Sequence, residues 1–274
     1  MNFYDEYFKK TNGDATEYKL KYLKSVVKNN TIYKFIQFDE NYSLNNVKLN
    51  ALKDEVLWFS YYKYLNDKTE FEINYDVMRV SREANKSPEF IKYLFDIMVE
   101  VYDICSFTYE YHKYMWREYA NYGNGICLLF YVNNLDVLFP IDYIEKNIID
   151  FSSLIIKSLN NSFGSIDYND PMALLPFVVK NPYNGILDST KEKEVRILYS
   201  PFYKEECNQG KVAPNIKTNV GHKGINVNYS DVGLSLKGII LGNKCESNME
   251  KEILKYSADC HIPMQVLRND FSKN

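Results

Sequence analysis

Short runs of β-branched and aromatic residues recur along the whole chain, and the helical stretches between them have unequal lengths. Runs of this composition are typical of β-strands. A regular alternation of strands and helices would predict a parallel, doubly wound sheet, and this sequence lacks that rhythm. We therefore expect an α+β fold with a mixed, mostly antiparallel sheet and flanking helices. The expected strands cover residues 31–38, 56–60, 103–108, 125–132, 192–199, 234–241 and 262–267.

Capping signals place the helices between these strands. Asp14 with Glu17 makes a cap-like start and predicts an N-terminal helix over about residues 14–29, packed on the rest of the domain. Pro88, directly after a serine, predicts the first turn of another helix. A capping box that begins at Ser247 predicts a helix to about residue 257. Further helices are expected after Ser43, around 110–121 and over about 141–161.

Composition and charge exclude several classes of protein. The chain has 274 residues, 46% of them hydrophobic and 25% charged, which is typical of a globular protein, and we expect one domain over residues 1–274. The formal net charge of −3 argues against a broad nucleic-acid-binding face, because such faces need a basic excess. The 5 cysteines include no CxxC pair and the 3 histidines are isolated from one another, so no metal site is expected.

The N-terminal residues lack the basic start and apolar core of a secretory signal. The longest apolar runs, at 125–132 and 173–179, are far too short to cross a bilayer. We therefore expect a cytoplasmic protein with reduced thiols and no membrane association. Nothing in the sequence indicates an oligomeric state.

The first candidate site is the strand expected at 192–199, where charged and apolar side chains alternate. Strand side chains point alternately to the two faces, so Glu192, Glu194 and Arg196 are expected on one face. The charged face either meets water as a ladder of ion pairs or lines a cleft. In a cleft, a rigidly held carboxylate would stabilise the oxocarbenium-like state that forms when ribose is transferred from a nucleotide. The sequence leaves both alternatives open.

Aromatic and polar side chains elsewhere supply further candidates. Trp116 and Tyr119 are three residues apart on an expected helix and share one face. That pair either packs in the core or forms the wall of a pocket for a nucleobase or nicotinamide ring. Ser60 ends an expected strand, where its hydroxyl would donate to a ligand. The chain lacks a dinucleotide fingerprint, a P-loop lysine, a GxSxG elbow and an HExxH motif.

Five stretches together resemble a bacterial family called domain of unknown function 2971, which is similar to the AbiGi-type abortive phage-resistance proteins. The stretch at 104–130 is the most specific, and the chain departs from the family pattern at three positions. Gly123 stands where the family often has histidine, Val195 where it often has an aromatic residue, and Lys68 where it usually has proline. The matching stretches are IYKFIQFDE (32–40), LWFSYYKYLND (57–67), ICSFTYEYHKYMWREYANYGNGICLLF (104–130), EKEVRILY (192–199) and LKGIILG (236–242).

The layout of this family resembles ADP-ribosyltransferase-like folds, which implies roles for the candidate residues. Glu194 would be the catalytic glutamate that stabilises the developing ribosyl cation, and Glu192 would position the acceptor. NAD would be the co-substrate, and the target would be a phage or host macromolecule. The residues implied in cofactor binding are Tyr33, Lys34, Ser60, Trp116, Tyr119 and Arg196.

The resemblance therefore implies an NAD-dependent ADP-ribosyltransferase-like effector in phage defence or as a toxin. The alternative is a non-catalytic recognition protein of a defence system, which would present an exposed aromatic surface in place of a deep cleft. A metal-dependent nuclease has the least support, since neither metal ligands nor a basic excess are present.

Overall fold

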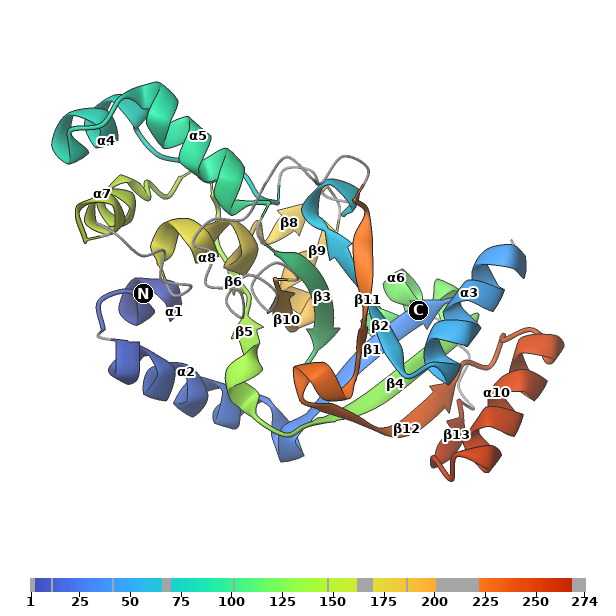
Figure 1. The fold of residues 1–274 in the computed structure, drawn as a ribbon. Coiled ribbons are helices and arrows are strands. Elements are labelled where there is room, and N and C mark those ends of the chain that lie inside the picture. Colours follow the sequence, from blue (N-terminus) through green and yellow to red (C-terminus); the bar gives the residue numbers. More distant parts are fainter. Residues whose placement is uncertain are drawn as a thin grey trace, which may run out of the picture.

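The computed structural model describes most of the chain, and Lys68 lies outside the described residues. It shows an α+β fold in which a mostly antiparallel sheet is flanked by helices, as expected (Figure 1). The described ranges are 3–10, 12–40, 42–65, 70–100, 102–146, 148–161, 170–185, 187–200 and 222–267.

The main sheet has the strand order β11-β2-β3-β1-β4-β12-β13, and β10 joins β3 to β5 beside this path. Its pairs are antiparallel except for β12 with β13. All seven expected strands form, with ends shifted by a few residues. The strands are β1 (Thr31–Gln37), β2 (Val56–Tyr61), β3 (Asp103–Thr108), β4 (Gly125–Val132), β5 (Leu138–Pro140), β10 (Glu194–Tyr199), β11 (Gly224–Asn228), β12 (Leu234–Leu241) and β13 (Met264–Val266).

Strand β3 is the branch point of this sheet. Along one edge it pairs with β10 over its whole length, from Asp103 to Thr108. Along the other edge it pairs with β2 at its start and with β1 only at Thr108. The sheet therefore splits into two wings on that edge. Lys34 bridges the gap between β1 and β3, because its Nζ donates to the Ser106 carbonyl oxygen at 2.9 Å.

The helices gather at the two ends of the sheet, with α4, α5 and α7 at one end and α3 and α10 at the other (Figure 1). Local capping explains several of the boundaries. Asp76 caps α4, Ser87 caps α5 and Asp170 caps α8, each by accepting a backbone N–H. The helices are α1 (Phe3–Tyr7), α2 (Asn12–Val26), α3 (Tyr42–Lys53), α4 (Val77–Ala84), α5 (Pro88–Met98), α6 (Lys113–Tyr119), α7 (Ser152–Asn161), α8 (Pro171–Val178) and α10 (Ser247–Asp259).

Three helix predictions need correction. The N-terminal helix covers Asn12–Val26 rather than about 14–29, so Asp14 lies within its first turn and does not start it. The helix ends before Asn29 and Asn30, which adopt left-handed backbone conformations with φ of 51° and 52°. The helix expected over 141–161 forms only from Ser152 onward, and its expected first half instead contains the short strand β6 (Asp142–Tyr143), which pairs with β7 (Val179–Lys180). Ser247 is the first residue of α10 and not its cap, so the expected capping box is absent.

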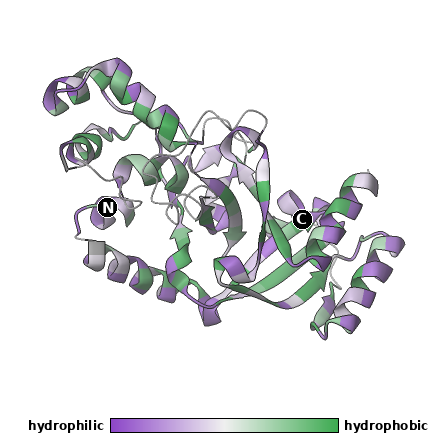
Figure 2. Ribbon diagram, in the orientation of Figure 1, coloured by the Kyte–Doolittle hydropathy of each residue, from purple (hydrophilic) through white to green (hydrophobic). Residues whose placement is uncertain are grey.

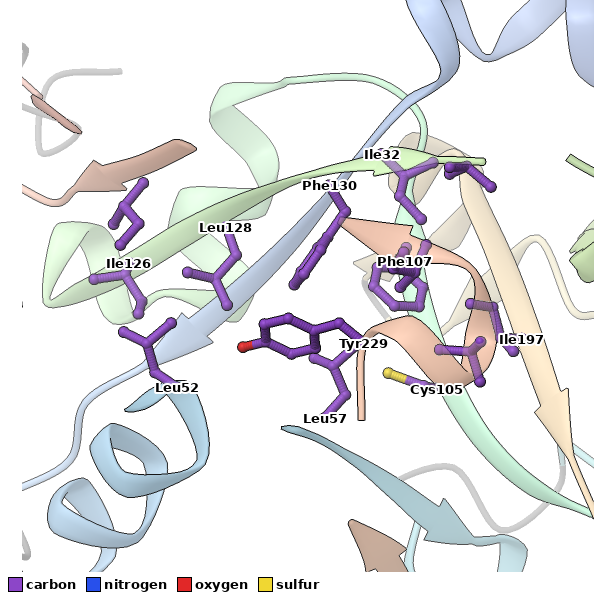
Figure 3. Packing of buried hydrophobic residues seen from close by; sticks show 14 of the residues in the cluster. Ile32, Leu52, Leu57, Cys105, Phe107, Ile126, Leu128, Phe130, Ile197 and Tyr229 are labelled. Atoms are coloured by element: carbon purple, nitrogen blue, oxygen red, sulfur yellow. The ribbon is translucent and has the colours of Figure 1, made fainter. Parts of the chain in front are cut away.

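Two large hydrophobic clusters and a smaller one stabilise this arrangement. Hydrophobic residues follow β4 and the end of β12, whereas α2 and α10 alternate between hydrophilic and hydrophobic residues (Figure 2). The apolar face of β10 enters the first cluster, where Ile197 packs with Cys105, Phe107 and Phe130 (Figure 3). The charged face of β10 therefore points toward the second cluster, which contains Ile104 from β3. Across the described part of the chain, no helix is long and apolar enough to cross a membrane.

Candidate functional site

The charged side chains of β10 are buried, so this face of the strand is not the solvated ladder of ion pairs that was one of the two alternatives left open by the sequence. Glu194 is 5% exposed and Arg196 only 1%. Glu192, at 6%, lies just before the strand in a 3₁₀ turn that covers Ser189–Glu192. Lys193 separates the two glutamates and adopts a left-handed conformation with φ of 48°. The expected alternation therefore begins at Glu194, and Glu192 reaches the same cluster from a turn.

Lys180 binds the two candidate glutamates from the end of β7. Its Nζ lies 2.7 Å from Glu192 Oε2 and 3.2 Å from Glu194 Oε2. A third carboxylate, Glu70, lies 3.7 Å from the same nitrogen. We call Glu70, Lys180, Glu192, Glu194 and Arg196 the ionic cluster.

Arg196 binds the inner side of the cluster with its whole guanidinium group. Its Nε donates to Glu194 Oε1 at 2.7 Å, and one terminal nitrogen donates to the Phe177 carbonyl oxygen at 2.8 Å. The other terminal nitrogen donates to Glu70. A buried guanidinium with every side engaged is well suited to hold two carboxylates in a fixed geometry.

The two glutamates differ in their protonation behaviour. With three carboxylates and two cations, the fully ionised cluster has one negative charge in excess. Burial would raise the pKa of Glu194, but its ion pairs with Arg196 and Lys180 outweigh burial and hold that pKa well below its usual range. Burial, followed by repulsion from Glu194, raises the pKa of Glu192 despite its contact with Lys180. Glu192 is therefore the group of this pair that exchanges a proton more readily.

Glu192 also lies at the outer end of the cluster. Its Oε1 accepts a hydrogen bond from the Tyr119 hydroxyl at 2.6 Å, and Tyr119 is 39% exposed. Both oxygens of Glu194, in contrast, are bound by buried cations. A ligand that approaches along the Tyr119 ring would therefore meet Glu192 before any other carboxylate of the cluster.

An unusual turn follows Tyr119 at the end of α6. Asn121, Tyr122 and Gly123 have consecutive positive φ angles of 43°, 54° and 98°. Left-handed conformations cost a non-glycine residue roughly 1–2 kcal/mol each, so the surrounding structure must enforce this turn. The φ of 98° at Gly123 gives a physical reason for glycine at this position.

The other predicted site residues fall into two groups. Trp116 is fully buried, donates from Nε1 to the Tyr111 hydroxyl at 3.0 Å and packs edge-on against Phe35, so it belongs to the core. Tyr33 lies closer to the cluster, because it pairs with Thr108, the residue that pairs with Glu194 on the other side. Two strand spacings put the Cα atoms of Tyr33 and Glu194 about 10 Å apart on the same face.

Ser60 and Lys34 do not join the ionic cluster. Ser60 pairs with Ile104, four residues along β3 from Thr108, which corresponds to roughly 14 Å. Lys34 follows Tyr33 on β1 and points to the opposite face, where its Nζ also lies 5.6 Å from the centre of the Phe107 ring. The structure therefore brings Glu192, Glu194, Arg196 and Tyr119 together and leaves these two apart.

Two members of the ionic cluster, Glu70 and Lys180, were not predicted as site residues from the sequence. Lys180 directly follows the wholly apolar stretch Ala173 to Val179, and a lysine at the end of a buried run is a signal that a partner carboxylate is near. Glu70 has no such signal, because its contact with Arg196 joins residues 126 positions apart.

Within the described ranges, no three His, Cys, Asp or Glu side chains are arranged to hold a metal ion. A further pair lies at the other end of β3, where Nε2 of the partly exposed His222 is 2.9 and 2.8 Å from the two carboxylate oxygens of the buried Asp103. Comparison of the chain with protein-family models, curated proteins and solved structures finds no significant match.

Proposed function

We propose that the protein is an ADP-ribosyltransferase-like effector that transfers ADP-ribose from NAD to a phage or host macromolecule. In this proposal Glu192 is the carboxylate that meets the substrate, and Glu194 is the group that holds the site together. The observation that carries the proposal is the position of Glu192, buried against Lys180 on one side and bound to the half-exposed Tyr119 on the other.

The chemistry follows from this position. The bond between the ribosyl carbon and nicotinamide breaks, nicotinamide leaves as a neutral molecule, and the ribosyl carbon acquires oxocarbenium character. A fixed carboxylate next to that carbon stabilises the positive charge. The acceptor then forms the new bond to the ribosyl carbon and loses its proton to Glu192, whose raised pKa suits it to accept a proton. The Tyr119 ring would form one wall of the site.

Glu194 is a poor target for testing this reaction. Its carboxylate neutralises part of the charge of two buried cations, so Glu194→Gln would disturb folding as well as chemistry. Glu192→Gln is the cleaner change, because Lys180 keeps Glu194 and Glu70 as partners.

The test is nicotinamide release from NAD by the purified protein, with cell lysate as the source of acceptors. Loss of a general base costs about 10²–10⁴-fold in rate, so Glu192→Gln should reduce release by at least about 100-fold. Glu252→Gln removes an exposed glutamate that pairs with Lys53, and this matched control should keep the wild-type rate. Circular dichroism checks that both variants are folded. A folded Glu192→Gln protein with an unchanged rate contradicts the proposal.

A second candidate is a non-catalytic recognition protein of a defence system. It is favoured by one observation, that every carboxylate of the ionic cluster is already bound by side chains of the protein itself. In this case the cluster is an internal support, and the exposed Tyr111, Tyr119 and Tyr122 contact the partner. It predicts no nicotinamide release by the wild-type protein and loss of partner binding in a Tyr111→Ala/Tyr122→Ala variant.

A further inference from the structure

Lys180 occupies the centre of the ionic cluster. Its ammonium group lies within 3.7 Å of carboxylate oxygens from Glu192, Glu194 and Glu70, and its side chain is only 11% exposed. An ammonium group has three N–H donors, which equals the number of carboxylates around it. The closest of the three contacts is the one with Glu192.

The backbone of Lys180 is held firmly in place. Val179–Lys180 pairs in parallel with Asp142–Tyr143, and the Ile144 N–H donates to the Lys180 carbonyl oxygen at 2.9 Å. The preceding helix α8 is buried at every residue after its first, from Met172 to Val178. The side chain of Lys180 therefore extends from a rigid backbone.

Glu192 has no comparable support from its own backbone. It ends a four-residue 3₁₀ turn, and the left-handed Lys193 follows it. Two contacts fix its carboxylate, Lys180 Nζ at 2.7 Å from the inside and the Tyr119 hydroxyl at 2.6 Å from the outside. Without Lys180, Glu192 would keep only the Tyr119 contact and would face the negative charge of Glu194.

We propose that Lys180 is a positioning residue that aims the Glu192 carboxylate and keeps it ionised. The effect of Lys180 on catalysis rests on the proposed transferase function, but the effect of Lys180 on the protonation of Glu192 does not. Lys180→Met leaves Glu192 next to Glu194 without the cation between them, so Glu192 takes up a proton at higher pH. Where ionised Glu192 is required, the pH at which nicotinamide release reaches half its maximum rises by the same amount. Lys180→Arg keeps the positive charge and should restore most of the wild-type pH profile.

The direct test follows the titration of Glu192 by NMR with ¹³C-labelled glutamate carboxyl groups, in the absence of NAD. The Glu192 signal is assigned by its loss in Glu192→Gln. Removal of an adjacent opposite charge should move the midpoint upward by about 1–3 pH units in Lys180→Met. Lys191→Met is the matched control, because Lys191 is 54% exposed and pairs with Asp188 on the same turn. It should leave the midpoint unchanged.

A midpoint that stays at the wild-type value in folded Lys180→Met protein overturns the proposal. If the single variant does not fold, Lys180→Met/Glu70→Gln replaces it, because losing one cation and one carboxylate together preserves the net charge of the cluster. The same upward shift is expected in that double variant, and an unchanged midpoint there also overturns the proposal. The titration needs no NAD, so the two proposals fail separately. If the wild-type protein releases no nicotinamide but the Glu192 midpoint shifts in Lys180→Met, the transferase function is wrong and the positioning role of Lys180 stands.

Discussion

Replacement of Arg196 by methionine should strongly weaken the folded state. The substitution keeps much of the side-chain volume but removes the three contacts of the guanidinium, to Glu194, Glu70 and the Phe177 carbonyl oxygen. Three carboxylates then share the single cation Lys180. Each hydrogen bond to a charged group contributes about 1.5–3 kcal/mol, and burial of a methionine returns about 1.5–3 kcal/mol.

We therefore expect Arg196→Met to lower the free energy of unfolding by about 3–5 kcal/mol, the range measured when one partner of a buried ion pair is removed. For a chain of this size the melting temperature should fall by roughly 6–20 °C. Urea denaturation followed by circular dichroism measures the first quantity and a thermal scan the second. Arg196→Lys should recover only part of the loss, because lysine cannot reach both carboxylates and the carbonyl together.

Arg79→Met is the matched control for this measurement. Arg79 is 36% exposed and pairs with Glu83 and Asp150 at the surface, so its loss should cost less than about 1 kcal/mol. If Arg196→Met lowers the free energy of unfolding no more than Arg79→Met does, the buried ionic cluster does not stabilise the fold, which contradicts the prediction.

Three further predictions concern single side chains. Tyr119→Phe removes a hydrogen bond that favours ionised Glu192, so the NMR midpoint of Glu192 should rise, whereas Tyr122→Phe should leave it unchanged. His222→Ala leaves the buried Asp103 without its partner and should lower the free energy of unfolding by about 1–3 kcal/mol in urea, and a value near zero contradicts this role. Because burial raises the pKa of Glu192, this carboxyl group binds its proton more tightly in the folded than in the unfolded state, where its pKa is about 4.3. The stabilising contribution of Glu192 should therefore fall as the pH rises from that value through the raised pKa. Urea denaturation across this window should show the wild type losing stability relative to Glu192→Gln, and parallel curves contradict the raised pKa.

The sequence was informative where local signals decide the structure. The helix after Ser87 begins at Pro88, as its cap and proline predict. The strand around Val195 and Ile197 also forms, because its alternating apolar residues enter the first hydrophobic cluster. Glu194 and Arg196 share a face for the same reason.

Other features depend on contacts that no local pattern records. Lysine has no special preference for a left-handed backbone, so the sequence does not indicate that Lys193 adopts this conformation. Because it does, the strand begins at Glu194 and leaves out Glu192. The burial of the charged face follows from Lys180 and Glu70, which come from distant parts of the chain. The resemblance implied that Ser60 belongs to the same site as Glu194, but the register puts Ser60 toward the other end of β3.

The proposal that Glu192 meets the substrate of an NAD-dependent transferase is tested by the initial rate of nicotinamide release. This rate is compared for the wild-type protein, Glu192→Gln and Glu252→Gln under identical conditions, each protein shown to be folded. We expect release by the wild type and by Glu252→Gln, and a loss of at least about 100-fold in Glu192→Gln. Equal rates in all three proteins, or no release by the folded wild type, would contradict it.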